Sequence, residues 1–231
     1  MSGNDNDPAG DLLIREVDDE LRQEFYLNLW RRYGKLAAAG AVALVLGVAG
    51  HQGWQTWQAR ERDKASQALK QADDRAAADD VKGAADALQA LEKTGPEGYR
   101  VMAAMRRADL LAGHGDPAGA ASVYDQLSQS GAPSIFRDLA AIKFALLTLD
   151  SGDPAKLTER ISPLAKPDNP WHYPATEILA LLARRQGQTD HARDLYKQLA
   201  DDLGAPADIR ARAAEMLAAT APGSTRDSTK G

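Results

Sequence analysis

Residues 114–127 read HGDPAGAASVYDQL and carry the clearest structural signal in the chain. The stretch opens on a tight turn, after which Asp116 is suited to cap a helix and Pro117 to occupy its first position, where a missing N–H costs nothing. Three small or apolar residues follow at intervals of four and three, which places them on one helical face: Ala120, Tyr124 and Leu127. The stretch therefore predicts a helix that starts after a turn and buries one face.

The same triplet recurs along the chain at spacings of 36, 37 and 35 residues. Further turn signals stand at Ser151–Pro154 and Gly187–Thr189. The triplets are Ala84, Leu88 and Leu91; Ala120, Tyr124 and Leu127; Leu157, Ile161 and Leu164; and Ala192, Tyr196 and Leu199. Repeats of this length are typical of tetratricopeptide-like helical hairpins, in which each triplet is the buried stripe of the second helix. We expect the third repeat to be distorted, because Leu157 replaces the Ala of the others.

Each turn is preceded by an apolar stretch that predicts the first helix of a hairpin. The clearest has one apolar face, to which Phe136 and Phe144 add bulk: Ile135, Leu139, Ile142, Leu146 and Leu149. Prolines stand at or near the starts of these helices, at positions 96, 133 and 174, and a last helix from Pro206 to Ala219 would cap the array. Frequent Ala and only 6% aromatic residues agree with an all-α fold. We therefore expect an α-solenoid of about four helical hairpins plus a capping helix over residues 58–220, with a disordered tail at 221–231.

Residues 36–57 form an uncharged stretch that would span about 33 Å as a helix. Aromatic residues stand near its two ends, where amphipathic rings prefer the headgroup regions: Trp30 and Tyr33 at one end, Trp54 and Trp57 at the other. The competing interpretation is a cleaved signal peptide, since Gly47–Ala49 offers small residues at a suitable spacing. However, 35 residues precede the stretch, with eight acidic and five basic side chains, which is unlike a short basic leader. We therefore predict a single transmembrane anchor.

The orientation follows from Arg31, Arg32 and Lys35, which lie just before the anchor and favour a cytoplasmic N-terminus, with the chain after about residue 58 outside. Residues 1–10 are predicted to be disordered. Residues 11–35 have the pattern of an acidic amphipathic helix in the cytosol. This helix is equally compatible with contacting a partner and with resting on lipid headgroups.

No residues are predicted to be catalytic, cofactor-binding or metal-binding. Cysteine is absent, and the four histidines are scattered singly without a second ligand at metal-binding spacing. The net charge of -5 argues against nucleic acid as a partner, and no motif indicates a small-molecule substrate. An acidic cluster is interpreted as a solvated face: Asp73, Asp74, Asp79 and Asp80. An enzyme is therefore not expected.

The chain resembles the YfgM-like family of inner-membrane proteins, in the form found in alphaproteobacteria. The likeness rests on Tyr33-Gly34-Lys35 at the opening of the anchor, Gly53-Trp54 with Trp57 at its close, and Ile14-Arg15-Glu16-Val17-Asp18 with Leu21-Arg22. The resemblance implies a bacterial inner-membrane protein with a cytosolic N-terminus and a periplasmic repeat domain. It further implies a non-enzymatic ancillary subunit of the SecYEG translocon that contacts periplasmic chaperones or emerging polypeptides. The alternative is a scaffold for another envelope complex, such as a cell-division or outer-membrane assembly machine.

Candidate partner-binding residues lie on the first helices and in the loop KPDNPWHYP, residues 166–174. In tetratricopeptide-like arrays the first helices line the concave face, so basic residues and exposed aromatics there are candidates for recognition. The candidates are Arg106, Arg107, Arg137, Lys143, Trp171, His172 and Tyr173. The alternative is that Trp171 and Tyr173 plug the junctions between hairpins and that the arginines are solvated.

Overall fold

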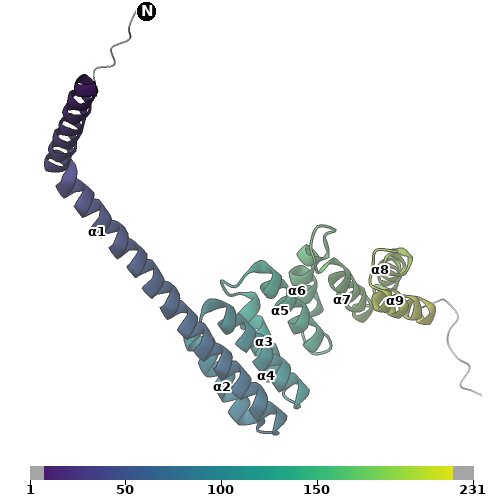
Figure 1. The fold of residues 1–231 in the computed structure, drawn as a ribbon. Helices are drawn as coiled ribbons and strands as arrows, with labels where there is room; N and C mark the ends of the chain where they lie inside the picture. The colour runs from purple at the N-terminus through teal and green to yellow at the C-terminus, as the bar shows by residue number, and fades with distance from the viewer. Residues whose placement is uncertain (1–7, 221–231) are drawn as a thin grey trace, which may run out of the picture. The chain divides into compact units, whose positions relative to one another are not determined.

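The computed structural model describes the backbone of residues 8–220 and the side chains of residues 30–220 apart from residue 37. Over residues 8–220 it contains helices and turns and no strand, which confirms the predicted all-α fold (Figure 1). The chain divides into two units, Met1–Arg60 and Glu61–Gly231. The predicted tail at 221–231 lies outside the described residues.

The first unit consists of most of the long helix α1, Pro8–Ala77. This helix contains the apolar stretch 36–57 and begins at Pro8, so Pro8, Ala9 and Gly10 are helical; the rest of the segment predicted to be disordered lies outside the described residues. Within Trp30–Ala77 the most apolar window has a mean hydropathy of 1.6, and few of its residues are buried. The helix is long and apolar enough to cross a membrane, a property that a signal sequence shares.

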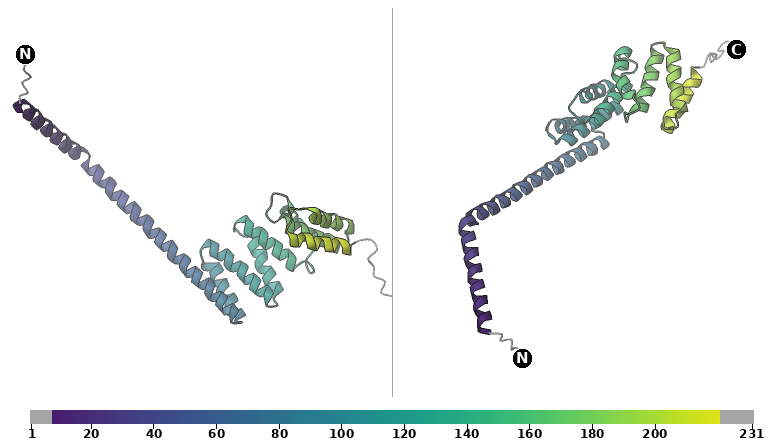
Figure 2. Two further views of the ribbon diagram at one scale, coloured as in Figure 1. Left: turned by 45° about the vertical axis from the view of Figure 1, so that its right-hand side comes forward. Right: turned by 90° about the horizontal axis from the view of Figure 1, so that it is seen from above.

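The second unit is built of helices packed in sequential pairs (Figures 1 and 2). Its elements after α1 are α2 Val81–Thr94, α3 Glu97–Gly113, α4 Pro117–Ser128, α5 Ser134–Leu147, α6 Pro154–Ile161, the 3₁₀ helix η1 Ser162–Ala165, α7 His172–Arg185, α8 Thr189–Asp201 and α9 Ala207–Ala219. The end of α1 pairs with α2 through Ala65 and Ala72, which share a core cluster with Leu88 and Leu91. With α3/α4, α5/α6 and α7/α8, this gives the four predicted hairpins, and α9 packs on α8 as the cap.

The buried stripe of the second helices is confirmed. All twelve triplet residues are between 0% and 8% exposed. Tyr124 and Tyr196 are among the largest fully buried side chains, and each belongs to the core cluster of its own hairpin. The spacing of 35–37 residues therefore reflects repeated packing of one helical face.

Aspartate side chains cap three second helices, two of them at turns that the sequence predicts. The Oδ1 atom of Asp116 accepts the N–H of Gly119 at 2.8 Å, and Asp153 accepts that of Ala155 at 2.9 Å. Asp80 caps α2 in the same way, accepting from Gly83 at 2.9 Å, although its sequence context suggested a solvated acidic cluster. A Cβ atom at residue 119 would lie 2.2 Å from the Asp116 carboxylate, so glycine at this position lets the cap close.

The first helices differ from the prediction in which side chains they bury. In α5, Ile142 is buried as expected, but Ile135 and Leu146 are exposed. Fully buried alanines stand instead at equivalent positions of successive first helices: Ala103, Ala140 and Ala175, and Ala108, Ala145 and Ala180. Small side chains allow neighbouring helices to approach closely, so at these positions size matters more than hydrophobicity.

The third repeat is distorted, as predicted. Helix α6 ends at Ile161 after eight residues and continues as the 3₁₀ helix η1. Pro163 lies within η1 and lacks the N–H that would continue an α-helix. Leu157 and Leu164 are nevertheless buried, in the core cluster that joins α5, α6 and α7.

Candidate protein-binding surface

Two of the predicted basic residues occupy equivalent positions on neighbouring first helices. Arg106 on α3 places Nη2 3.3 Å from Oδ2 of Asp73 on α1. Lys143 on α5 places Nζ 2.6 Å from Oδ1 of Asp109 on α3. Each base thus reaches back to an acid on the preceding first helix, and we call these two ion pairs the charge ladder.

Asp109 also connects the ladder to the core. It accepts a hydrogen bond of 2.5 Å from the hydroxyl of the buried Tyr124. The ammonium of Lys143 lies 5.5 Å from the centre of the same tyrosine ring, within cation–π range. Lys143 therefore contributes to the packing between repeats, and its charge already has an acidic partner.

The environment of these tyrosines predicts how the protein responds to alkali. Burial raises the pKa of Tyr124 and of Tyr196 above the ordinary value of 10.0, and the hydrogen bond to Asp109 raises the Tyr124 pKa further. A folded-state pKa above the unfolded value gives stability that is complete below the unfolded pKa and is lost as the pH rises above it. We expect these two phenols to ionise only as the protein unfolds.

The measurement is a titration of phenolate absorbance alongside helical circular dichroism, with the urea-unfolded chain as the control. In that control all six tyrosines should titrate together near pH 10. If every phenolate in the folded protein formed before any helix was lost, the assigned burial of Tyr124 and Tyr196 would be wrong.

Arg107 points away from Arg106 and has a structural role. Its Nε and Nη2 atoms bind the two carboxylate oxygens of Glu92 on α2 at 2.6 and 2.8 Å. The two side chains are only 16% and 17% exposed. Arg107 therefore joins α3 to α2 by a half-buried, bidentate ion pair and has little surface to offer a partner.

Arg137 lies apart from the other basic candidates. It precedes Lys143 on α5 by six residues, which separates the two side chains by about 120° around the helix axis. Arg137 is exposed and has no hydrogen-bond or ion-pair partner among the side chains described. The predicted basic set is thus divided, with Arg106 and Lys143 on one face and Arg137 on another.

The aromatic residues at the start of α7 lie at junctions between hairpins. The indole Nε1–H of Trp171 donates to the carbonyl of Ile135 at 3.1 Å, and its ring packs against the cluster joining α5, α6 and α7. Nδ1 of His172 lies 2.5 Å from the carbonyl oxygen of Ala165. Tyr173 packs against the cluster formed by α7, α8 and α9. All three side chains are half-buried, and partner binding by them stays a prediction.

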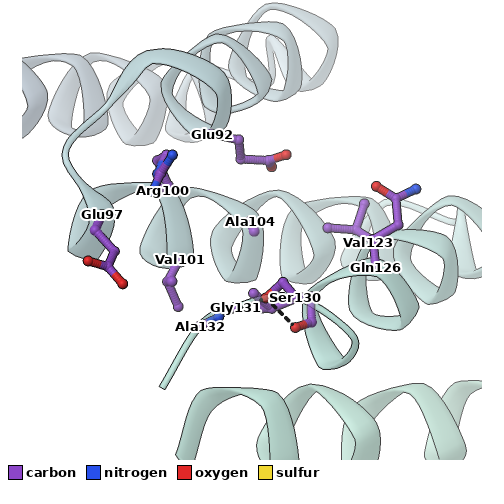
Figure 3. A pocket seen from close by; sticks show the side chains of 11 residues that line it. Glu92, Glu97, Arg100, Val101, Ala104, Val123, Gln126, Ser130, Gly131 and Ala132 are labelled. Carbon is purple, nitrogen blue, oxygen red and sulfur yellow. Dashed lines mark hydrogen bonds between the residues drawn. The ribbon is translucent and has the colours of Figure 1, made fainter. Parts of the chain in front are cut away.

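A cleft of about 380 Å³ lies over α3, between α2, α4 and the turn before α5 (Figure 3). Its floor is apolar: Val101, Ala104, Val123 and Leu127. Glu97, Arg100 and Gln126 supply polar groups at the rim, and the Oγ of Ser130 accepts the N–H of Ala132 to shape the turn. No local sequence pattern predicts this cleft, because its walls come from three different helices and depend on how these helices pack.

The described side chains offer no evident catalytic chemistry. Among them, no three His, Cys, Asp or Glu residues stand close enough to hold a metal ion. What the surface offers is a set of side chains on stacked helical hairpins, which suits recognition of another polypeptide.

The hairpins place the protein in the class of helical repeat proteins, and comparison with known families specifies the group. Residues 28–217 match the tetratricopeptide repeat-like domain family, and the chain belongs to that family. Comparison with curated proteins and with solved structures gives no match. Domains of this family are typically non-catalytic and act in protein–protein interaction.

Proposed function

We propose that the protein is a membrane-anchored adaptor whose repeat domain binds protein partners in the periplasm. The observation that carries the proposal is that one helix, α1, contains both the apolar segment and residues of the first repeat. Ala65 and Ala72 of this helix are buried against α2, so the segment and the repeat domain are continuous in helical structure. An anchor of this kind would tether the repeat domain to the membrane.

Two further observations support an anchor that is retained. The family match begins at residue 28 and therefore includes the whole of the apolar segment 36–57 together with the repeats. The long acidic segment before residue 36 also differs from the basic start of a signal peptide. We propose cytosolic residues 1–35, a span over 36–57 and a periplasmic repeat domain over 58–220.

The specific role that we propose is that of an ancillary subunit of the Sec translocon of the bacterial inner membrane, linking it to periplasmic chaperones or clients. The support is the resemblance of residues 14–22, 33–35 and 53–57 to YfgM-like proteins. The family match agrees with an interaction domain in this role. Chemical cross-linking in native membranes, followed by mild detergent purification and mass spectrometry, tests the proposal. Recovery of translocon subunits supports it, whereas recovery of division or outer-membrane assembly proteins without them would replace it with the envelope-scaffold role.

The proposed topology predicts the activity of reporter fusions. A reporter that is active only in the periplasm should be active when fused after Ala219 and inactive when fused after Gly34, just before the apolar segment. The purified protein should retain its N-terminal segment. An N-terminal sequence beginning near Gly50 would show that the apolar segment is a cleaved signal peptide.

A further inference from the structure

The face of the first helices that carries the charge ladder also exposes large apolar side chains. Met102 on α3 is 47% exposed, and Phe136 on α5 is 38% exposed. Phe136 shares a face of α5 with Leu139 and Lys143, because residues three, four and seven positions apart are neighbours on a helix. Folding has left these apolar groups at the surface, in contrast to the twelve buried triplet residues.

The register of the ladder aligns these side chains across helices. Lys143 contacts Asp109, and seven residues earlier on the two helices stand Phe136 and Met102. Seven residues are about two helical turns, so this pair lies on the same side as the ion pair. The register therefore sets Phe136 opposite Met102, nearer the starts of the helices.

The same register continues to the next hairpin. Trp171 follows Phe136 by one repeat, and its indole nitrogen reaches the Ile135 carbonyl of α5. This contact brings the start of α7 against the start of α5, the helix on which Phe136 is followed by Leu139 about one turn later. We name the resulting line across α3, α5 and α7 the apolar strip: Met102, Phe136, Leu139 and Trp171.

The electrostatics beside the strip indicate what it would bind. The neighbouring charges are already matched within the protein, since Arg106 pairs with Asp73 and Lys143 with Asp109. A charged ligand would have to compete with these pairs, whereas an uncharged apolar segment would cover exposed carbon without disturbing them. Helix axes about 10 Å apart make the strip roughly 20 Å long, which an extended segment of about six residues spans.

We propose that the apolar strip binds an extended, uncharged apolar segment of the kind that an unfolded polypeptide exposes. This inference rests on the proposed adaptor function and assigns its client class. Burial of the exposed parts of Met102 and Phe136 would supply the affinity, and alternate side chains of the segment would face the helices. The interaction would therefore be insensitive to salt.

The test is calorimetric titration of the full chain in lipid nanodiscs. The probe is a synthetic peptide of about ten residues, alternating Leu and Ser, which is long enough to cover the strip. We expect binding that is unchanged between about 0.05 and 0.5 M salt. The double variant Met102→Ser, Phe136→Ser should bind about tenfold more weakly or not at all. The matched control is Leu203→Ser, which also removes a large apolar side chain, 88% exposed but outside the strip, and should bind like the wild type.

The outcomes separate this inference from the adaptor function. Circular dichroism confirms that the variants remain folded, and a second pair, Met102→Ala with Phe136→Ala, replaces the first if its melting temperature falls. Three results would overturn the proposal that the strip binds an apolar segment. These are that the wild-type protein does not bind the peptide, that Leu203→Ser weakens binding as much as the double variant does, or that a charged version of the peptide binds more tightly. If cross-links to the translocon were still found after such a result, the adaptor function would remain supported and only the proposed client class would be refuted. If the double variant lost binding to a folded partner protein but still bound the peptide, an unfolded polypeptide as the client of the strip would likewise be refuted.

Discussion

Replacing Tyr124 by Ala should lower the free energy of unfolding of the repeat domain by about 3 kcal/mol or more. The ring is 2% exposed and belongs to the core cluster that α3, α4 and α5 share. Its removal would leave a cavity between two hairpins and would free Asp109 from one of its hydrogen bonds. Urea titration of the full chain in nanodiscs, followed by circular dichroism, measures the change. A shift below about 0.5 kcal/mol would show that the proposed register is wrong.

The two buried tyrosines offer a matched comparison of their hydroxyl groups. The Tyr124 hydroxyl donates to Asp109, whereas the Tyr196 hydroxyl is buried without a partner in the described part of the chain. Tyr124→Phe should therefore cost about 1–3 kcal/mol. Tyr196→Phe should be neutral or slightly stabilising, since it removes a polar atom that gains nothing from burial. Equal effects of the two substitutions would argue that the bond to Asp109 contributes nothing.

Replacing Arg107 by Ala should destabilise the repeat domain by about 3 kcal/mol, because it leaves the half-buried carboxylate of Glu92 unpaired. The adjacent Arg106 is the control. Its ion pair with Asp73 is solvent-exposed, so Arg106→Ala should cost less than about 1 kcal/mol. Denaturant titration compares the two variants.

The pairing itself is tested by a double-mutant cycle. Adding Glu92→Ala to Arg107→Ala should restore part of the lost stability, because the unpaired charge is then removed. A double variant whose loss equals the sum of the single losses would show no coupling between the two side chains. A partner-binding defect of Arg107→Ala must accordingly be corrected for unfolding before it is interpreted as recognition.

The second helices could be predicted from sequence because their buried residues are large and periodic. The Ala-Tyr-Leu triplet at residues 120–127 has two bulky members whose intervals match a helix face. The first helices could not be predicted as well, since in α5 the most buried side chains are Ala140 and Ala145. Alanine is common on exposed faces also, so hydrophobicity alone pointed to Ile135 and Leu146, which are exposed.

The candidate site was predictable only to the level of residue type and helix. Arg106 and Arg107 are neighbours in sequence, but the helix turns them about 100° apart, toward Asp73 and Glu92 respectively. Those partners lie in other helices, and their identity depends on how the hairpins stack. The indole bond of Trp171 to Ile135, 36 residues away, likewise depends on tertiary packing. In the sequence, these partners are indicated only by the repeat spacing, when residues one repeat apart are compared for charge as well as for hydrophobicity.

The bonds of Lys143 to Asp109 and of Trp171 to Ile135 span 34 and 36 residues, about one repeat length. Arg185 on α7 likewise donates to the carbonyls of Leu149 and Gly152, which lie 36 and 33 residues before it. A chain that emerges N-terminus first, from a ribosome or through a membrane pore, therefore meets the partners of each new hairpin in the segment that has just preceded it. Every hairpin can settle on its predecessor as soon as it is free, with only a small loop-closure entropy to overcome. Such an order of assembly suits a protein in which one helix, α1, carries the apolar segment and also begins the first repeat. Each later hairpin then packs on a hairpin that has already formed.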